Sequence, residues 1–144
     1  MRAASRRSLT RWGDSASSRY PRELFTAILA FSLKYPELAA IWLVSRGSEN
    51  MAGGVAFYWN RHAVYWHGVM DDEFQAESPS NTLVGEMIRD ACERGFGFFD
   101  FNPSGGHDKV ADFKRRFGTK VVAFQRADYT APALKWVGKL RGKT

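Results

Sequence analysis

The stretch of sequence that most constrains the fold runs from Gly95 to Gly118, GFGFFDFNPSGGHDKVADFKRRFG. Its apolar run, Phe96–Phe101, predicts a buried strand, and the Asn-Pro-Ser-Gly-Gly turn that follows cannot continue that strand. A helical period starts after the turn, because apolar residues recur three and four apart within Val110–Phe117. The segment therefore predicts a strand, a glycine-rich turn and a short basic helix with backbone N–H groups at its start. Such groups suit a ligand that carries negative charge or a carbonyl oxygen.

Length and composition favour one folded domain. The chain has 144 residues, of which 44% are hydrophobic and 15% aromatic, as expected of a domain with a core. No apolar run approaches the ~20 residues that a membrane-spanning helix needs, so the sequence predicts a soluble protein. Cys92 is the single cysteine, which excludes an internal disulfide and favours a reducing, cytoplasmic compartment.

The net charge of +6 belongs to the two ends of the chain. Residues 1–19 carry five arginines and one aspartate, and residues 131–144 carry four basic residues and no acid. The body is close to neutral, so it is not expected to be a nucleic-acid-binding face. We expect a disordered basic lead-in at 1–19, a folded domain at 20–128 and a basic tail at 129–144. The tails are suited only to weak, salt-dependent contacts with RNA or with an anionic inner membrane surface.

Hydrophobic periodicity predicts an α/β fold, an α+β sandwich in the order helix, three strands, helix, strand, helix, strand. The first helix starts near Tyr20, with Ser18 as its cap and Pro21 in its first turn. Short polar turns join the next three strands into an antiparallel meander, in which Gly53 and Gly54 indicate a bulge or a close approach of the backbone. The expected elements outside the opening segment are a helix over Tyr20–Lys34, strands over Ala39–Ser45, Met51–Trp59 and Ala63–Val69, a helix ending at Gly95, and a final strand over Lys120–Arg126.

The second helix follows a polar, acidic loop over Asp71–Ser80. Its expected cap is one of residues 80–82, and its apolar stripe over Leu83–Cys92 is typical of a helix that lies on a sheet. Because Cys92 belongs to this stripe, we expect it in the core and chemically inert. Asp108 is the expected N-cap of the helix that follows the glycines.

Three segments resemble one branch of the GNAT superfamily of N-acetyltransferases. They are AGGVAFYW, SPSNTLVGEMIRDACERGFGFFDFNPSGG and VADFKRRFG. The helix ending at Gly95, the strand end Asp100–Ser104 and the F-K-x-x-F-G element over Phe113–Gly118 are similar to the BioF2-like acetyltransferase domain. They are also similar to the second GNAT-like half of the Fem aminoacyltransferases, which form peptidoglycan bridges. The resemblance covers residues 20–126 and implies a GNAT-like fold, in which an antiparallel meander precedes a splayed pair of central strands.

The resemblance implies an N-acyltransferase, which moves an acyl or aminoacyl group onto an amine acceptor. GNAT enzymes hold the coenzyme A pyrophosphate in a Q/R-x-x-G-x-G/A loop, whereas this chain has Asp71–Glu77 there, with four acids and no glycine. Carboxylates repel a pyrophosphate, so acyl-CoA is disfavoured at that place and aminoacyl-tRNA is the alternative donor. Fem enzymes have two GNAT-like halves. The chain is therefore either a single-domain relative or the C-terminal portion of a longer protein, with a second half or a second copy as its partner.

Lys114 and Asp100 are the candidate catalytic residues. The resemblance places Lys114, the lysine of the F-K pair, near the acyl-transfer centre, where a cation stabilises the developing oxyanion. Alternatively, Lys114 is one of several basic residues on a solvated helix face. Asp100 alternates with phenylalanines along its strand and is either a proton acceptor in a cleft or a strand-end acid paired with Lys109 or Arg115.

The turn after the strand supplies most of the candidate substrate-binding residues. Asn102 and Ser104 either donate hydrogen bonds to the acyl carbonyl or the acceptor, or serve only the turn. Gly105 and Gly106 expose backbone amides in the same turn, and Phe113 of the F-K pair completes this set.

His67, in the third strand, is the last candidate for substrate binding. It is either a base near neutral pH or an ordinary half-buried strand histidine. The neighbouring Tyr65 and Trp66 form aromatic ladders with Tyr58 and Trp59, which cross-strand packing explains. The three histidines and one cysteine have no metal-ligand spacing, so no metal site is expected. The sequence leaves two functions, an N-acyltransferase and a non-catalytic GNAT-like module that recognises a partner.

Overall fold

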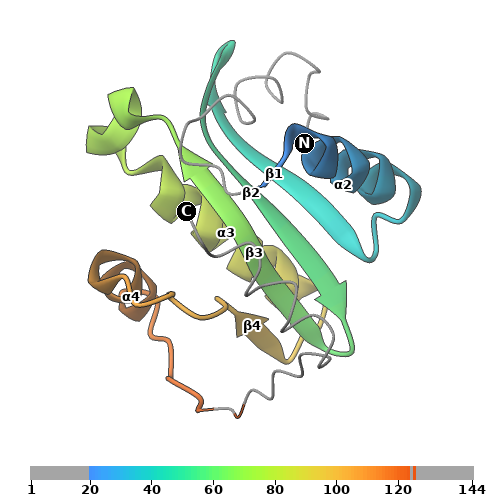
Figure 1. The fold of residues 1–144 in the computed structure, drawn as a ribbon, viewed down its shortest axis with the longest axis vertical. Coiled ribbons are helices and arrows are strands. Elements are labelled where there is room, and N and C mark those ends of the chain that lie inside the picture. Colours follow the sequence, from blue (N-terminus) through green and yellow to red (C-terminus); the bar gives the residue numbers. More distant parts are fainter. Residues whose placement is uncertain (1–19, 124, 126–144) are drawn as a thin grey trace, which may run out of the picture. The chain divides into compact units, whose positions relative to one another are not determined.

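The structure is a computed structural model that describes residues 20–123 and 125. The lead-in at 1–19, with its Ser18 cap, and the tail at 129–144 lie outside the described residues. The chain divides into two compact units, residues 1–105 and residues 106–144. The elements (Figure 1) are α2 (Arg22–Lys34), β1 (Ala39–Arg46), β2 (Glu49–Trp59), β3 (His62–Met70), the 3₁₀ helix η1 (Asp72–Glu77), α3 (Pro79–Glu93), β4 (Phe98–Asp100) and α4 (Asp108–Arg115).

The strands β1, β2 and β3 form the predicted antiparallel meander. Each pairing extends along the whole of the shorter strand, apart from one irregularity in each. The connection between β2 and β3 consists of Asn60 and Arg61, whose φ angles of 45° and 64° are both left-handed. A two-residue hairpin of this hand matches the natural twist of the strands, so it keeps them in register.

The fourth strand is shorter and more exposed than the buried strand predicted over Phe96–Phe101. It spans Phe98–Asp100, pairs in parallel with β3 over three residues and leaves Phe98 60% exposed. The prediction was wrong at its start because Phe96 still completes the preceding helix, where its N–H donates to the carbonyl of Ala91.

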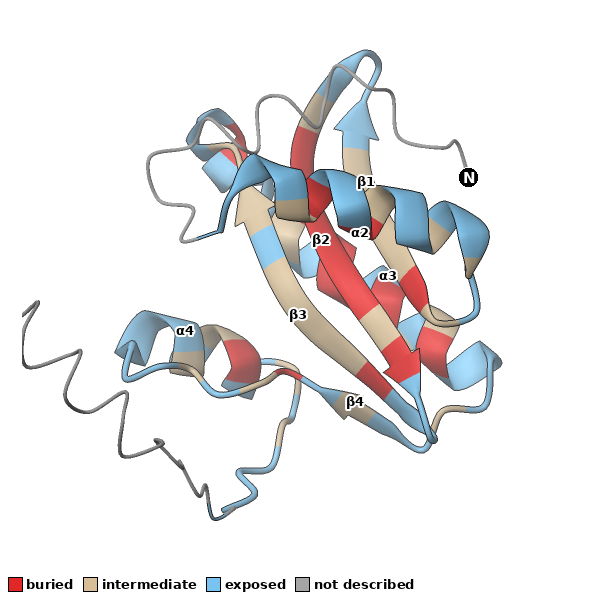
Figure 2. Ribbon diagram, turned by 45° about the vertical axis from the view of Figure 1, so that its right-hand side comes forward, coloured by how far each residue is buried: buried red, intermediate tan, exposed pale blue. Residues whose placement is uncertain are grey.

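The helices α2 and α3 cover opposite faces of the sheet (Figures 1 and 2). On the α3 side, small alanines on the strands let the helix approach closely, and a hydrogen bond of 3.2 Å from Trp42 Nε1 to Tyr58 Oη satisfies two buried polar groups. Figure 2 shows buried residues along most of β2 and intermediate ones along most of β3. The core on the α3 side consists of Trp42, Ala52, Ala56, Tyr58, Ala63, Leu83, Met87 and Ala91.

Three expectations about the second helix were wrong. It begins at Pro79, before the predicted cap at 80–82, since a proline at the first helical position loses no hydrogen bond. The preceding acidic loop contains the 3₁₀ helix η1. Cys92 is exposed because the helix meets the sheet through a narrow stripe that includes Ala91, and the next residue lies about 100° further round. Gly95, with φ of 77°, follows the helix end as predicted.

The helix of the second unit is confirmed, with a different cap. The N-cap is His107, and Asp108 lies instead in the first turn, where its carboxylate interacts favourably with the helix dipole. The rings of Phe113 and Phe117 contact each other at a centroid distance of 5.3 Å, as the predicted helical period requires.

The strand predicted over Lys120–Arg126 is wrong for residues 120–123, which are not in a strand. Val121 is 93% and Val122 79% exposed. A run of β-branched residues is suited to a pleated sheet, but it forms a strand only where a neighbouring strand pairs with it.

Among the described residues, no helix is long and apolar enough to cross a membrane.

Candidate active site

The strands β3 and β4 separate after three residue pairs, and this opening is the centre of the candidate site. The last pair joins Val64 to Asp100, while β3 continues to Met70. Among the described residues, no strand pairs with β3 beyond Val64 on that side. The predicted splay of the central strands is confirmed. Unpaired backbone groups on such an edge can bind an extended ligand that carries amides.

Asn102 links the two strands at the point where they separate. Its Nδ2 donates to the carbonyl oxygen of Tyr65 at 3.1 Å, and its backbone N–H donates to Asp100 Oδ1 at 2.7 Å. The φ of Asn102 is 58°, a left-handed conformation that asparagine adopts more readily than most residues. Asn102 and Asp100 therefore both serve the turn. Their predicted roles in substrate binding and proton transfer stay predictions.

The remaining turn residues lie on both sides of the boundary between the units. Ser104 is half-buried and Gly105 is exposed, and both end the first unit. Gly106 begins the second unit, and the φ angles of the two glycines, 61° and 81°, are left-handed and suit glycine. The predicted contacts of these three residues with a substrate stay predictions.

A β-bulge in β3 lies beside the opening. Val55 pairs with His67 and Ala56 pairs with Tyr65, so Trp66 is an extra residue without a partner on β2. Side chains alternate between the faces of a regular strand, and a bulge shifts that alternation by one residue. Trp66 and His67 therefore both lie on the α2 side of the sheet, while Tyr65 lies on the α3 side. On β2 itself the irregularity lies at Met51, before the paired glycines, and the close approach given as the alternative occurs at Gly54, where a Cβ would lie 3.1 Å from Tyr65 Cε2.

Aromatic rings surround the bulge on the α2 side. The ring of Trp66 lies 4.9 Å from that of Tyr20, 6.2 Å from Phe25 and 5.8 Å from Phe57. The imidazole of His67 lies 5.4 Å from Phe25 and 5.9 Å from Tyr20. Burial lowers the pKa of His67, so the imidazole is neutral near pH 7 and can accept a proton.

Tyr65 lies on the α3 side of the bulge and was not among the expected site residues. Gly54 and Gly68 leave room for its ring. A Cβ at residue 68 would overlap the Tyr65 hydroxyl and lie 2.6 Å from Cζ, and one at residue 54 would lie 3.1 Å from Cε2. Burial raises the pKa of Tyr65 to about 12, so the phenol stays protonated at neutral pH. The only signal in the sequence for a buried ring at Tyr65 is the pair Gly54 and Gly68, and these glycines do not predict the bulge.

In the second unit, Lys114 is buried on α4. Its exposure is 9%, so the alternative that it belongs to a solvated helix face is wrong, although Lys109 on the same helix is exposed. Phe113 is half-buried beside it, and Arg115 forms an ion pair with Asp112. The roles of Lys114 in acyl transfer and of Phe113 in substrate binding stay predictions.

The acidic segment before α3 is less negative than its sequence indicates. Glu77 forms an ion pair with Arg46 at 2.7 Å, and the Arg46 guanidinium also lies 5.0 Å from the centre of the Phe74 ring. Asp71 Oδ1 accepts a hydrogen bond of 3.2 Å from the backbone N–H of Glu73. One of the four carboxylates is thus paired with a cation, which weakens the expected repulsion of a pyrophosphate.

Within residues 20–123 and 125, no cluster of His, Cys, Asp and Glu could hold a metal ion.

A meander that runs into a parallel strand, with an opening between the two, defines the class of fold. The sequence model of one family, the acetyltransferase (GNAT) domain, matches residues 1–115. Because the match covers most of the chain, the protein belongs to the GNAT acetyltransferase family. No curated protein matches the sequence.

Solved structures share this fold at low sequence identity. The ribosomal-protein-S18-alanine N-acetyltransferase from Escherichia coli is 11% identical, with a TM-score of 0.66 over 92% of this chain and 84% of that chain. The structure of AAC(6')-Iy with the bisubstrate analogue CoA-S-monomethyl-acetylneamine is 14% identical, with a TM-score of 0.69 over 89% of this chain and 97% of that chain. Glucosamine-6-phosphate N-acetyltransferase from Arabidopsis thaliana is 14% identical, with a TM-score of 0.60 over 85% and 86%. At these identities the likeness establishes the fold alone.

Proposed function

We propose that this protein is an N-acyltransferase that moves an acyl group from a coenzyme A thioester onto an amine. One observation carries the proposal. In a chain of the GNAT family, the edge of β3 stays open beyond Val64, beside the bulge at Trp66. The pantetheine arm of coenzyme A is an extended chain with amide groups, so it can add to this edge as a further strand would. The structural relative with a bound coenzyme A analogue supports this choice of donor.

The proposed reaction requires two proton movements. The protonated amine first gives a proton to His67, whose neutral imidazole lies beside the opening. The amine nitrogen then attacks the thioester carbonyl carbon, and the negative charge that develops on the oxygen needs a cation or a hydrogen-bond donor, the role that the family resemblance implies for Lys114. The carbon–sulfur bond breaks as the amide forms, and the departing thiolate takes the second proton of the amine. Holding both reactants at one strand edge supplies much of the acceleration.

Within the family, we propose a BioF2-like or Fem-like subtype on the basis of the F-K-x-x-F-G element over Phe113–Gly118. A Fem-like enzyme acts in peptidoglycan synthesis and takes aminoacyl-tRNA as its donor. The acidic segment over Asp71–Glu77 is the reason for keeping that donor, or a non-catalytic module, as the alternative to acyl-CoA. The same subtype implies a second GNAT-like half or a second copy as partner. A cytoplasmic site of action, with the basic tails touching RNA or the inner membrane surface, completes this proposal.

A thermal-shift experiment tests the donor. At a concentration of acetyl-CoA that is 100 times its Kd, bound ligand stabilises the folded protein by about 2.7 kcal/mol. Longer acyl-CoAs and free coenzyme A distinguish recognition of the acyl group from recognition of the nucleotide. If none of these ligands raises the melting temperature, acyl-CoA is not the donor, and aminoacyl-tRNA or a non-catalytic role replaces it.

A pair of lysine variants tests the proposed oxyanion contact. Lys114→Gln keeps most of the side-chain volume and removes the charge, so we expect transfer to fall about 100-fold. Lys109→Gln makes the same change on the exposed face of α4 and is expected to leave the rate unchanged. If Lys114→Gln lowers the melting temperature but leaves the rate intact, Lys114 is structural.

A further inference from the structure

The side of α2 that faces away from the sheet lacks the charges that normally cover a surface helix. The stretch from Leu24 to Leu33 contains no acidic or basic side chain. In α3, by contrast, Arg89 on the exposed side forms ion pairs with Glu86 and Glu93. A surface helix is ordinarily apolar toward the core and charged toward water, whereas a helix that is apolar all round is covered on both sides. The composition of α2 is thus that of a helix with a second contact.

The exposed residues of α2 form a continuous stripe. Phe25 and Ile28, 3% and 7% exposed, mark the side of the helix that packs on the sheet. Each residue of an α-helix is turned about 100° from the one before it, so residues spaced three and four apart share a side. Figure 2 shows exposed residues along the side of α2 that faces away from the sheet. The outer stripe is defined by five exposed residues on this side, Glu23, Ala27, Ala30, Phe31 and Lys34.

The middle of the outer stripe is apolar and suits a close contact. Ala27 and Ala30 have no polar side-chain atom, and such small side chains let a second helix approach closely. Phe31 beside them is 39% exposed, and Leu33 at the edge of the stripe is 70% exposed. The hydroxyl of Thr26, which borders the stripe, already donates to a backbone carbonyl one turn earlier in the helix at 3.3 Å. A partner therefore gains about 25 cal/mol for each Å² of apolar surface that it buries and leaves no hydroxyl unpaired.

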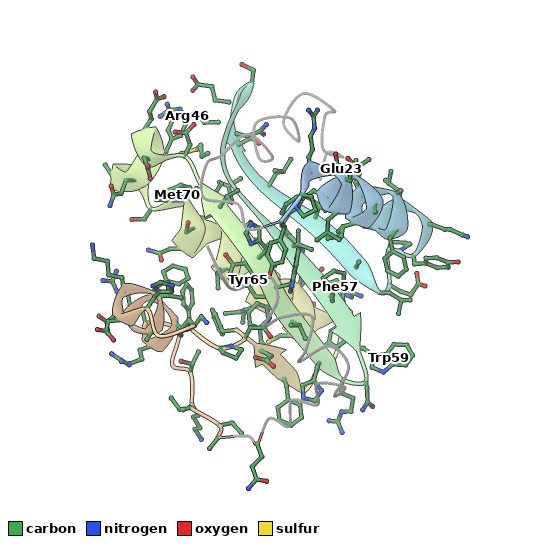
Figure 3. All side chains as sticks on the ribbon, in the orientation of Figure 1. Glu23, Arg46, Phe57, Trp59, Tyr65 and Met70 are labelled. Atoms are coloured by element: carbon green, nitrogen blue, oxygen red, sulfur yellow. The ribbon has the colours of Figure 1, made fainter. Side chains whose placement is uncertain are left out.

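The two ends of the outer stripe carry opposite charges. Glu23 lies in the first turn of α2 (Figure 3) and Lys34 in the last turn, where each interacts favourably with the helix dipole. Among the residues that the structure describes, neither side chain forms an ion pair. The Nζ of Lys34 lies over the ring of Tyr35, 5.0 Å from its centre. Both charges are thus available to a partner of the reverse polarity.

A second copy of α2 that runs in the antiparallel direction has this reverse polarity. When Ala27 of one helix lies opposite Ala30 of the other, Glu23 lies opposite Lys34 at both ends, because both pairs are centred on the same point of the helix. The alanines then meet at the middle, where the helices approach most closely, and each Phe31 ring flanks the alanines of the other copy. A parallel pair would instead set Glu23 against Glu23 and Lys34 against Lys34, with repulsion at both ends.

We propose that the outer stripe binds the outer stripe of a second copy of this chain, as an antiparallel pair of helices related by a twofold axis. The stripe is complementary to itself, as an isologous interface requires. This inference goes beyond the proposed acyl transfer and does not depend on it. A helix of 13 residues is only about 20 Å long, so the interface is smaller than the standard size. The dimer is therefore weak, with an expected Kd of about 10–100 µM.

Sedimentation velocity of the full chain measures this self-association. Between about 2 µM and about 500 µM, the weight-average sedimentation coefficient should rise from that of a monomer towards that of a dimer. A monomer across this whole range would overturn the proposal. Species larger than a dimer would also overturn it, because an isologous pair is closed.

A matched pair of arginine variants locates the interface. Ala27→Arg places a bulky charge at the centre of the pair and keeps a good helix former, so the Kd should rise by about tenfold or more. Cys92→Arg introduces the same side chain on the exposed side of α3 and should leave the Kd unchanged. An unchanged Kd in Ala27→Arg overturns the proposal, because the dimer would then use another surface. A lower melting temperature of the Ala27→Arg monomer overturns it as well, since the stripe would then pack against its own chain.

Charge reversal tests the antiparallel direction and leaves the apolar contacts in place. Glu23→Lys and Lys34→Glu each set like charges against one another at both ends, so each should raise the Kd about fivefold. The double variant Glu23→Lys/Lys34→Glu restores both ion pairs and should return the Kd to within about twofold of the original value. Asp72→Lys makes the same change of charge in η1 and should leave the Kd unchanged. Additive weakening in the double variant would overturn the antiparallel pair.

Discussion

The two faces of the sheet differ most at the bulge in β3. On the α3 side, Leu83 and Met87 are each 1% exposed and pack against small strand residues, which gives a closely packed core. On the α2 side, the strand presents Trp66 and His67, both half-buried, at adjacent positions. One extra residue in β3 produces this difference, because it moves a second large side chain onto the α2 side. Both faces bury apolar side chains, since Phe25 and Ile28 of α2 are 3% and 7% exposed, and what distinguishes the α2 side is this half-buried pair of candidate residues.

The largest expected effect is on the α3 side. Leu83→Ala removes a fully buried side chain and leaves a cavity, so the free energy of unfolding should fall by about 3 kcal/mol in urea titration. Leu33→Ala on α2 is the matched control, because Leu33 is 70% exposed and its loss should change stability by less than about 0.5 kcal/mol. Equal effects of the two substitutions would mean that Leu83 is not packed against the sheet as the structure shows.

A smaller loss is expected where Tyr65 fills the space over Gly68. Gly68→Ala forces the tyrosine ring out of its position beside Gly54, and the free energy of unfolding should fall by about 2 kcal/mol. Gly85→Ala is the control, since a Cβ there meets no atom within 4 Å and the residue is inside α3. That substitution should stabilise the protein by about 1 kcal/mol. If Gly85→Ala also destabilised the protein, the loss in Gly68→Ala would not be specific to the contact with Tyr65.

The link between β3 and β4 should contribute less again. Asn102→Ala removes the hydrogen bond to Tyr65 and places alanine at a φ of 58°, so we expect a loss of about 1–2 kcal/mol. Asn102→Gly keeps the backbone conformation and removes only the side-chain bond. If the two variants have the same free energy of unfolding, the loss comes from the side-chain hydrogen bond and not from the left-handed backbone conformation. Transfer activity should fall in both, because the width of the opening changes.

The smallest expected effect is the pH dependence that His67 adds. Burial lowers its pKa in the folded state below the ordinary value of 6.5. The unfolded chain therefore binds more protons than the folded one below that pH, and stability is lost as the pH falls from 6.5 towards the folded pKa. Replacing His67 by Gln should flatten the melting temperature between pH 7 and about pH 5. An unchanged slope would show that His67 is not desolvated on the α2 side.

Much of the fold was predictable because its signals are local. Alternating apolar residues and short polar turns predict the meander, and the apolar stripe predicts the helix that ends at Gly95. The strand predicted over Phe96–Phe101 was only half right, since apolar character does not specify pairing length. Residues 120–123 have high β-propensity and are not in a strand. Propensity describes what a segment can do, whereas pairing depends on a neighbour that is distant in sequence.

The sequence by itself determined the candidate site residues, since Asp100, Asn102 and His67 were all candidates on residue type and position. Only the tertiary structure decided which of them share a surface. The extra residue in β3 is visible only against the register of β2, and it sets the faces on which Tyr65 and Trp66 lie. Register is a relation between two strands, so no pattern within one strand contains it. The same holds for the opening, which exists because the partner strand stops early while β3 continues.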